Sequence, residues 1–200
     1  MNVLIACEFS AIVRDEFRKR GHNAWSCDII PTEGDARWHI RTEVLGLLSG
    51  LRHPDADGSF DDGRPLYWHL MIAHPPCTRL TVAGARWFKG REKEQADAIA
   101  FAEALWNAPI DKIALENPIG VLSTRSTLGK PTQIIQPWQF GHGETKATCL
   151  WLKGLPKLQS TDIVDGRLAR VHKEPPGPDR WKNRSRTYTG IARAMAEQWG

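Results

Sequence analysis

Trp68-His69-Leu70-Met71-Ile72-Ala73-His74-Pro75-Pro76-Cys77 is the stretch of sequence that best indicates how this chain folds. Its apolar run, residues 70–73, is too short for a helix and predicts a buried β-strand, which the two prolines then end. In open α/β sheets, ligands bind in the crevice beyond the carboxyl ends of the strands, so this strand would carry Cys77 to such a crevice. A lone cysteine is usually a small buried hydrophobe, but the prolines remove ladder donors and favour a position off the sheet. We therefore interpret Cys77 as a candidate nucleophile.

A second predicted strand ends in a similar way. Residues 112–115 form a short buried strand, and Glu116 follows it with an asparagine and a proline behind. Burying an unpaired carboxylate is costly, so a carboxylate at this position indicates a functional rather than a structural role. If the two strands are parallel neighbours, Glu116 lies across the crevice from Cys77.

The N-terminal part predicts a crossover unit of strand, helix and strand. Residues 2–7 are almost continuously apolar, as in strands that a parallel sheet buries on both faces. The helix that follows can be capped by Ser10 and ends at Gly21, and its basic side chains, Arg14 among them, fall on the polar face. The second strand closes on Asp28.

The position of Asp28 is typical of nucleotide-binding crossover units, which carry an acid about twenty residues past the first turn. The glycine fingerprint of such units is missing, because Cys7, Phe9 and Ala11 occupy its positions. Spacing alone therefore leaves two interpretations of Asp28 open, a cofactor ligand and an ordinary turn residue at a strand end.

Hydrophobic periodicity predicts the remaining elements, which are a strand at 38–41, helices at 42–51 and 92–107, an antiparallel pair at 133–136 and 147–152, and a final helix at 189–199. Strands that alternate with helices predict an α/β fold. We expect a Rossmann-like sheet with helices on both faces and an antiparallel hairpin at its edge.

Basic residues gather in two segments that could contact phosphates. Arg79 and Arg86 lie in the loop at 78–90, directly after Cys77. Residues 167–186 hold seven Lys or Arg against two acids, and these cations include Arg180, Lys182 and Arg184. Binding of a nucleic-acid backbone and simple solvation explain such charge runs equally well at this stage.

Composition limits the class of protein. Two hundred residues suffice for one ordinary domain, and the net charge of +4 with a pI near 9.0 favours nucleic acid only slightly. The four cysteines form no Cys-x-x-Cys pair and no signal peptide is recognisable, so we expect a reducing, cytoplasmic compartment. No apolar run approaches the roughly twenty residues of a membrane span, so no membrane contact is expected. The acidic run at 55–63 lacks the closing glutamate of a calcium loop, and no metal is expected.

Three strand-end features together resemble the DNA cytosine-5 methyltransferases. They are the Pro-Pro-Cys of residues 75–77, the Glu-Asn-Pro of 116–118 and Asp28. Outside these features the resemblance is weak, and it extends from residue 2 to about 155. The first turn, with its Ala-Cys-Glu-Phe-Ser sequence, resembles that of compact, phage-encoded members of the family. The resemblance implies a seven-stranded sheet that binds S-adenosylmethionine, with DNA as the partner.

The same resemblance implies roles for individual residues. Cys77 would attack carbon 6 of cytosine, and Glu116 would donate a proton to ring nitrogen 3, which requires a carboxyl pKa raised by burial. The target base must then be flipped out of the duplex or already single-stranded. The cofactor-binding residues implied are Cys7, Glu8, Phe9 and Ser10 in the first turn, Asp28 with Ile29 at the ribose, Glu43 at the adenine, and His74.

The chain also departs from the family pattern. The Gln-x-Arg-x-Arg strand of the family reads Glu-Thr-Lys-Ala-Thr at residues 144–148, so only Lys146 keeps a catalytic cation. The large target-recognition region of the family is reduced here to the basic arm. We therefore expect a catalytic core at 1–156, a recognition arm at 157–186, and a final helix at 187–200 that packs back on the core.

Three other functions are considered. A zinc-dependent nucleobase deaminase needs a second cysteine three residues after the first, and Leu80 stands there instead. An amino-methyltransferase would carry an aromatic residue where Cys77 stands. A catalytically idle nucleic-acid-binding module on a methyltransferase scaffold is the third, and the missing glycines favour it.

Overall fold

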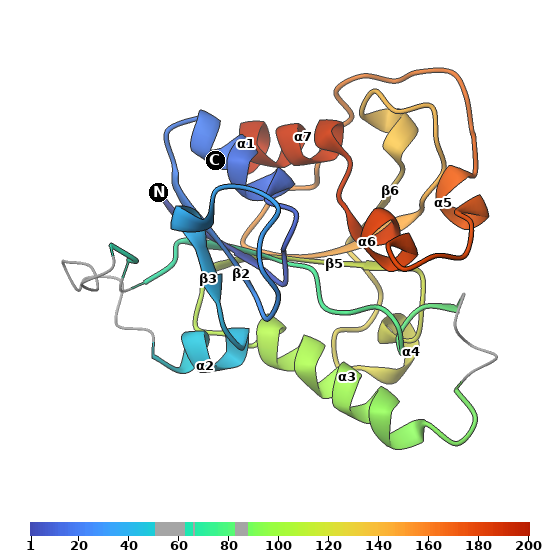
Figure 1. Ribbon diagram of the computed structural model, residues 1–200, viewed down its shortest axis with the longest axis horizontal. Helices are drawn as coiled ribbons and strands as arrows, with labels where there is room; N and C mark the ends of the chain where they lie inside the picture. The colour runs from blue at the N-terminus through green and yellow to red at the C-terminus, as the bar shows by residue number, and fades with distance from the viewer. Residues whose placement is uncertain (51–62, 66, 83–87) are drawn as a thin grey trace.

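Seven strands form a single sheet in the computed structural model, which describes residues 1–50, 63–65, 67–82 and 88–200. The strand order is β3-β2-β1-β4-β5-β7-β6 (Figure 1). The bounds are β1 (Asn2–Ala6), β2 (Asn23–Asp28), β3 (His39–Arg41), β4 (Leu70–Ala73), β5 (Lys112–Pro118), β6 (Gln133–Ile135) and β7 (Thr148–Lys153). The predictions for the acidic residues 55–62 and for Arg86 lie outside the described residues.

The strand directions confirm the expected fold class. Strands β3, β2, β1, β4 and β5 are parallel, whereas β7 runs antiparallel to both β5 and β6. The predicted edge hairpin is therefore the β6–β7 pair. Because β1, β4 and β5 are parallel neighbours, their carboxyl ends meet at one edge of the sheet.

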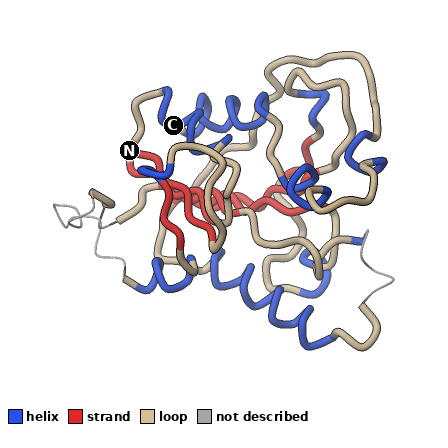
Figure 2. Tube along the Cα trace, in the orientation of Figure 1, coloured by secondary structure: helices blue, strands red, loops and turns tan. Residues whose placement is uncertain are grey.

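Helices cover both faces of this sheet (Figures 1 and 2). On one face lie α1 (Ile12–Lys19) and α7 (Thr189–Trp199). On the other lie α2 (Val44–Ser49), α3 (Glu92–Trp106) and α4 (Leu122–Arg125). The short elements are η1 (Ala36–Trp38), η3 (Pro137–Gln139), α5 (Arg170–Lys173) and α6 (Arg180–Ser185). In the described part of the chain, no helix is both long and apolar enough to cross a membrane.

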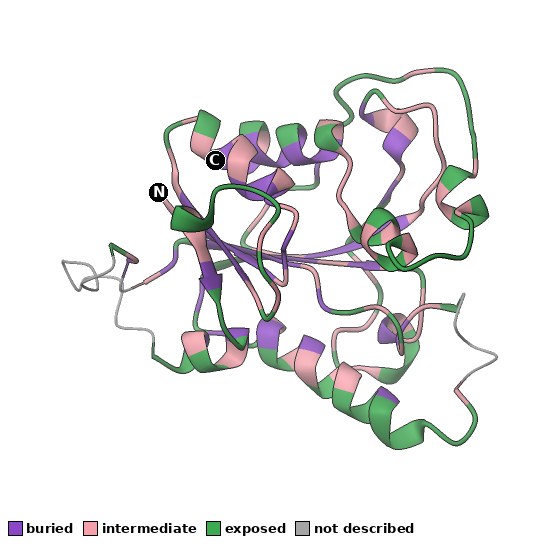
Figure 3. Cartoon of the chain, viewed as in Figure 1, coloured by how far each residue is buried: buried purple, intermediate pink, exposed green. Residues whose placement is uncertain are grey.

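Alternating side chains of the central strands fill the two cores between sheet and helices. In β1, Val3 and Ile5 pack toward α1 and α7, whereas Leu4 and Ala6 pack toward α2 and α3. All four are fully buried, which explains why the strand is apolar throughout (Figure 3). Burying each Val, Ile or Leu contributes roughly 1.5–3 kcal/mol, so the centre of the sheet is a rigid base for the segments at its edge.

The prediction that Ser10 caps the first helix is confirmed only in part, because its hydroxyl accepts just one long hydrogen bond, 3.4 Å, from the Ile12 N–H, and Glu8 is the main cap. The Glu8 carboxylate accepts hydrogen bonds from the backbone N–H groups of Val13 at 2.7 Å and Arg14 at 3.3 Å. Ala11 stands at the N-cap, and its side chain has no acceptor. A carboxylate also complements the positive end of the helix dipole, so it outcompetes a serine hydroxyl.

Strand β5 is longer than the apolar pattern predicts. It continues through residues 116–118, because these residues pair with β7, with Glu116 opposite Leu150. Glu116 therefore belongs to the strand itself and does not follow it. Its backbone is held by pairing with β7, whereas the β4 register ends one residue earlier, at Leu115.

Candidate active site

A cavity lies at the edge of the sheet where β1, β4 and β5 end. Its floor consists of three segments, residues 7–10 after β1, residues 74–77 after β4, and residues 116–118 at the end of β5. Lys146, just before β7, and residues 184–187, at the end of α6, complete the lining. The two strand ends singled out by the sequence therefore share one cavity.

Cys77 is partly buried in this cavity and is one of four free cysteines. Burial and the negative charge of Glu116 raise the pKa of its thiol above the ordinary value, while the charges of Lys146 and Arg184 partly oppose this shift. The sulfur is therefore a neutral thiol at pH 7 in the free protein. Lys146 and Arg184 are the groups that favour its thiolate.

Glu116 differs from the expectation of a raised pKa. Burial raises the pKa of its carboxyl, but a hydrogen bond from His74 and the charges of His74 and Lys146 outweigh burial and bring the pKa below its ordinary value. His74 Nδ1 lies 2.7 Å from Glu116 Oε2. In the free protein the carboxyl is therefore ionised, and the expected protonated acid is wrong for this state.

Asn117 connects the two strand-end segments directly. Its side-chain amide donates a 2.9 Å hydrogen bond to the backbone carbonyl of Pro75, and the residue is buried. The bond fixes the distance between the segment that carries Cys77 and the strand that carries Glu116. Sequence reasoning missed this role, although the residue follows Glu116 directly in the motif.

The turn after β1 adopts the backbone conformation that glycines would favour, without glycines. Cys7 has φ of 59° and Ala11 has φ of 64°, both in the left-handed region. Such conformations cost a non-glycine residue roughly 1–2 kcal/mol each. The turn thus has a left-handed backbone at two of the three positions where the glycine fingerprint would have glycine. Its lining residues are Cys7, Glu8, Phe9 and Ser10.

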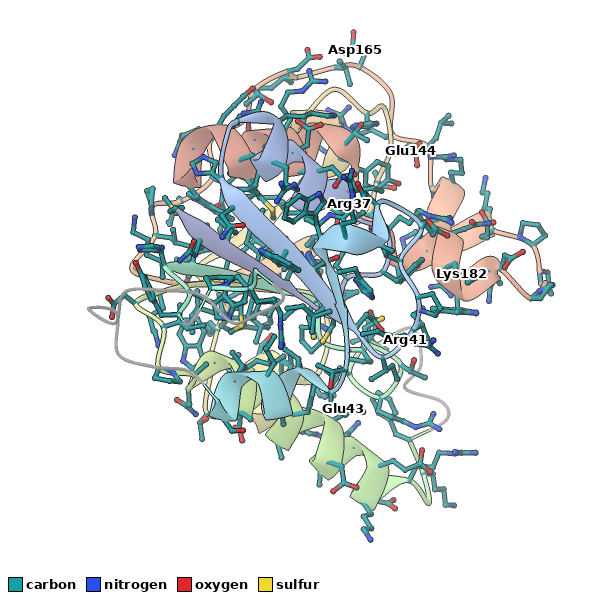
Figure 4. All side chains as sticks on the ribbon, turned by 60° about the vertical axis from the view of Figure 1, so that its left-hand side comes forward. Arg37, Arg41, Glu43, Glu144, Asp165 and Lys182 are labelled. Atoms are coloured by element: carbon teal, nitrogen blue, oxygen red, sulfur yellow. The ribbon has the colours of Figure 1, made fainter. Side chains whose placement is uncertain are left out.

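The other candidate cofactor residues lie beside the cavity. Asp28 ends β2, and burial together with the charge of Glu43 raises the pKa of its carboxyl, although backbone N–H groups oppose the shift. Both carboxylates act electrostatically on Cys7, which lines the cavity. Figure 4 shows Glu43 near the start of α2, below Arg41. Ile29 is 59% exposed and offers an apolar surface next to Asp28.

The predicted nucleic-acid contacts fall into two groups. Arg184 lines the cavity, and its Nε atom is buried with no partner among the described residues. Lys182 points outward from α6 (Figure 4), and Arg180 donates to a backbone carbonyl in the same arm. Arg79 instead forms a 2.6 Å ion pair with Glu94 and does not line the cavity.

Three contacts hold α6 and the residue after it at the cavity, and sequence reasoning missed them. The ring centroids of Phe9 and Trp181 are 5.6 Å apart. Arg186 forms a 2.6 Å ion pair with Glu33, and Lys146 Nζ lies 3.3 Å from the carbonyl oxygen of Arg186. No spacing rule connects residues so far apart in sequence, so only the fold reveals this arrangement.

Comparisons with known proteins find a similar fold in solved structures. A DNA modification methyltransferase encoded within an E. coli prophage matches with 10% identity and a TM-score of 0.48, over 88% of this chain and 55% of that one. The Entamoeba histolytica methyltransferase EhMeth matches with 11% identity and a TM-score of 0.47, over 88% and 60%. The S. pombe Dnmt2 methyltransferase matches with 12% identity and a TM-score of 0.43, over 86% and 53%.

The chain thus spans between about half and three fifths of the length of these proteins. No protein-family model and no curated protein matches the sequence. Within the described ranges, His, Cys, Asp and Glu side chains nowhere gather in groups of three or more that could hold a metal ion.

Gly120 sets how closely the loop after Cys77 approaches the segment after β5. The Val121 N–H donates a 2.8 Å hydrogen bond to the Leu80 carbonyl. A Cβ atom at Gly120 would collide with that carbonyl and lie 2.9 Å from the Cα atom of Thr81. We expect Gly120→Ala to lower the free energy of unfolding by roughly 1–3 kcal/mol, because the backbone has to move.

Gly46→Ala is the matched control, since a Cβ at Gly46 in α2 meets nothing within 4 Å. Alanine there should raise the free energy of unfolding by about 0.5–1 kcal/mol, because it is the better helix former. Urea denaturation at 25 °C measures both variants. A Gly120→Ala protein as stable as wild type would show that this contact does not constrain the loop.

Proposed function

We propose that this chain is a DNA methyltransferase that transfers a methyl or related one-carbon group from S-adenosylmethionine to carbon 5 of cytosine. The observation that carries the proposal is the meeting of Cys77 and Glu116 in one cavity, with Lys146 beside them. A nucleophile, a proton donor and a cation around one ring are what this reaction requires.

The chemistry at Cys77 follows from the electronic structure of cytosine. Carbon 5 is a poor nucleophile until the Cys77 sulfur bonds to carbon 6 and pushes electrons toward nitrogen 3. Glu116 then donates a proton at nitrogen 3 and so neutralises the charge that develops there. Once carbon 5 is substituted, it loses its proton, the carbon–sulfur bond breaks, and Cys77 leaves with the electron pair.

The residues around the first turn fit the proposed cofactor. Cys7 and Ala11 have the left-handed backbone conformation that a glycine-rich turn would have. The turn can therefore bind a ligand in the way of a glycine-rich turn, although it lacks the glycines. Residues 7–10, Asp28 with Ile29, Glu43 and His74 would hold it. When bound, S-adenosylmethionine supplies the transferable group as an electrophilic substituent of its sulfonium.

For the substrate we propose DNA whose target base is flipped out or single-stranded. Support comes from the basic residues of α6, because Arg184 faces the cavity while Arg180 and Lys182 lie in the same helix.

In this proposal residues 157–186 are the recognition arm of a catalytic core at 1–156, and the segment 187–200 packs on that core. Arg79 would contact a phosphate in exchange for its ion pair with Glu94, and Arg86 stays a candidate phosphate contact from the sequence alone. The free cysteines fit a reducing, cytoplasmic compartment.

Nucleoside mass spectrometry tests the proposal. Purified protein is incubated with DNA and S-adenosylmethionine carrying a labelled methyl group, and the DNA is then digested to nucleosides. We expect labelled 5-methyldeoxycytidine, and we expect none with the Cys77→Ala protein. Label at an amino nitrogen of cytosine or adenine would contradict the carbon 5 assignment.

Calorimetry with S-adenosylmethionine separates the enzyme from an idle nucleic-acid-binding module on the same scaffold. The enzyme should give binding heat with the cofactor alone. An absence of binding heat, together with unmodified DNA, would favour the idle module.

A further inference from the structure

His74 follows β4 directly and contacts Glu116, the acid of the proposed reaction. Its backbone N–H donates to the Ala6 carbonyl at 3.0 Å, which fixes it at the carboxyl end of β4. Its Nδ1 atom lies 2.7 Å from Glu116 Oε2, and the two side chains are only 11% and 13% exposed. The remaining ring atom, Nε2, is buried and has no partner in the described part of the chain.

The charged groups around this pair come from every element at the cavity. Glu8 from the first turn acts electrostatically on His74, but its oxygens already accept three hydrogen bonds, from the backbone N–H groups of two α1 residues and from a serine hydroxyl. Cys77, Lys146 and Arg184 face the same cavity. Of these groups, only His74 has a titratable hydrogen-bond donor on the Glu116 carboxylate.

The ionised state of Glu116 leaves the proposed reaction without a proton source. Its pKa lies below the ordinary value although burial raises it, because the hydrogen bond from His74 and nearby positive charge favour the carboxylate. A carboxylate cannot donate to nitrogen 3. The proton on His74 Nδ1 is the nearest one that the structure directs at this carboxylate.

We propose that His74 is a positioning residue that orients Glu116 and supplies it with the proton that Glu116 passes to the substrate. This inference rests on the proposed function. Glu116 touches nitrogen 3, and His74 acts through Glu116. No described residue binds Nε2, so the hydrogen bond to Glu116 alone orients the imidazole ring.

The proton and electron balance is as follows. Cys77 enters as a thiolate, its proton having left to solvent, and its electron pair forms the bond to carbon 6. The carbon 5–carbon 6 π pair shifts to carbon 5–carbon 4, and the carbon 4–nitrogen 3 π pair moves onto nitrogen 3. Nitrogen 3 takes a proton through Glu116, while Nδ1 gives its proton to the carboxylate, so the imidazole ends neutral and Glu116 ends ionised. The carbon 5–carbon 4 π pair then forms the bond to the transferred group, whose old bonding pair would stay with the donor. The pair on nitrogen 3 restores the carbon 4–nitrogen 3 π bond, and the nitrogen 3 proton returns by the same path. Carbon 5 finally loses its proton to solvent, the freed pair forms the carbon 5–carbon 6 π bond, and Cys77 leaves with the carbon–sulfur pair.

His74→Asn tests the relay, because the asparagine amide can still donate a hydrogen bond to Glu116 but carries no transferable proton. We expect methyl transfer at pH 7.5 to fall by roughly 10²-fold. The ratio of the wild-type rate to the variant rate should shrink as the pH is lowered. The falling thiolate fraction of Cys77 slows both proteins alike, whereas Glu116 of the variant binds more of its protons from solvent. The second measurement needs no cofactor. In protein labelled with ¹³C at the glutamate carboxyl carbons, the Glu116 signal, assigned from Glu116→Gln, should titrate at higher pH in His74→Asn than in wild type.

His69→Asn is the matched control, because His69 lies just before β4, at the opposite end of the same strand, where the Asn2 N–H donates to its ring. It should leave both the pH profile and the Glu116 titration unchanged. A His74→Asn protein with the wild-type pH profile, or with Glu116 titrating as in wild type, would overturn the relay. An unchanged pH profile would follow if Glu116 received its proton from the Cys77 thiol. If His74→Asn does not fold, His74→Gln replaces it in both measurements.

These outcomes are separate from those of the proposed function. If wild-type protein transfers no methyl group at any pH, the proposed function fails. If it transfers methyl and the variant behaves as wild type, only the role of His74 fails.

Discussion

Cys77→Ala is expected to reduce methyl transfer to DNA by at least about 10⁴-fold, because Cys7, the other thiol that lines the cavity, has a pKa raised by burial and by the charges of Asp28 and Glu43. The free energy of unfolding should stay within about 1 kcal/mol of wild type, since Cys77 lies outside the sheet ladder and is partly exposed. Tritium transfer from labelled S-adenosylmethionine measures the first quantity and urea denaturation the second. A loss of activity without a loss of stability is the signature of a nucleophile.

Cys149→Ala is the control for this experiment. Cys149 is buried in β7 and packs in the core beneath the sheet. Burial raises its pKa to about 11, so its thiol is neutral at the assay pH. This variant should lose some stability and keep methyl transfer. Activity retained by Cys77→Ala would show that the nucleophile has been assigned wrongly.

Glu116→Gln is expected to change two properties of the site in opposite directions. Methyl transfer should fall by about 10²–10³-fold, because glutamine cannot pass a proton to nitrogen 3. Alkylation of Cys77 by iodoacetamide at pH 7.5 should become faster. The sign follows from electrostatics, since the negative charge of Glu116 raises the pKa of Cys77, and removing it increases the thiolate fraction.

Lys146→Met provides the opposite test at the same sulfur. The positive charge of Lys146 lowers the pKa of Cys77, so its removal should slow alkylation. The other three thiols should not be alkylated at this pH, because their pKa values are raised by burial. The pKa of Cys27 is about 12, that of Cys149 is about 11, and that of Cys7 is raised as well. Peptide mass spectrometry follows the label at each cysteine. Slower or unchanged alkylation in Glu116→Gln would mean that Glu116 does not act on Cys77.

The sequence predicts the central sheet well because its strands are buried on both faces. Residues 70–73 are apolar without interruption, and each is fully buried in β4. The pattern predicts a final helix at 189–199, and α7 has these bounds. Arg14 illustrates the limit of periodicity. The pattern puts it on the polar face of α1, but it is fully buried, where it donates to the Ser26 hydroxyl and to backbone carbonyls of residues 35 and 38.

The candidate site could be predicted in part. Strand ends that carry Cys77 and Glu116 must meet if β4 and β5 are parallel neighbours, and they line one cavity. The ionisation of Glu116 could not be predicted, because it depends on a hydrogen bond from His74 across two strands. The position of α6 depends on side-chain contacts between distant segments, such as the Glu33–Arg186 ion pair, and no local pattern encodes them.

The most direct test of the central claim is covalent capture with DNA that contains 5-fluorocytosine at the target position. Fluorine at carbon 5 cannot leave as a proton does, so the intermediate is trapped after Cys77 has bonded to carbon 6. In the presence of S-adenosylmethionine, intact mass spectrometry should show a denaturant-resistant protein–DNA complex, and peptide mapping should locate the link at Cys77. DNA methylated by the wild-type protein without any such complex, or a complex linked through another residue, would contradict the account.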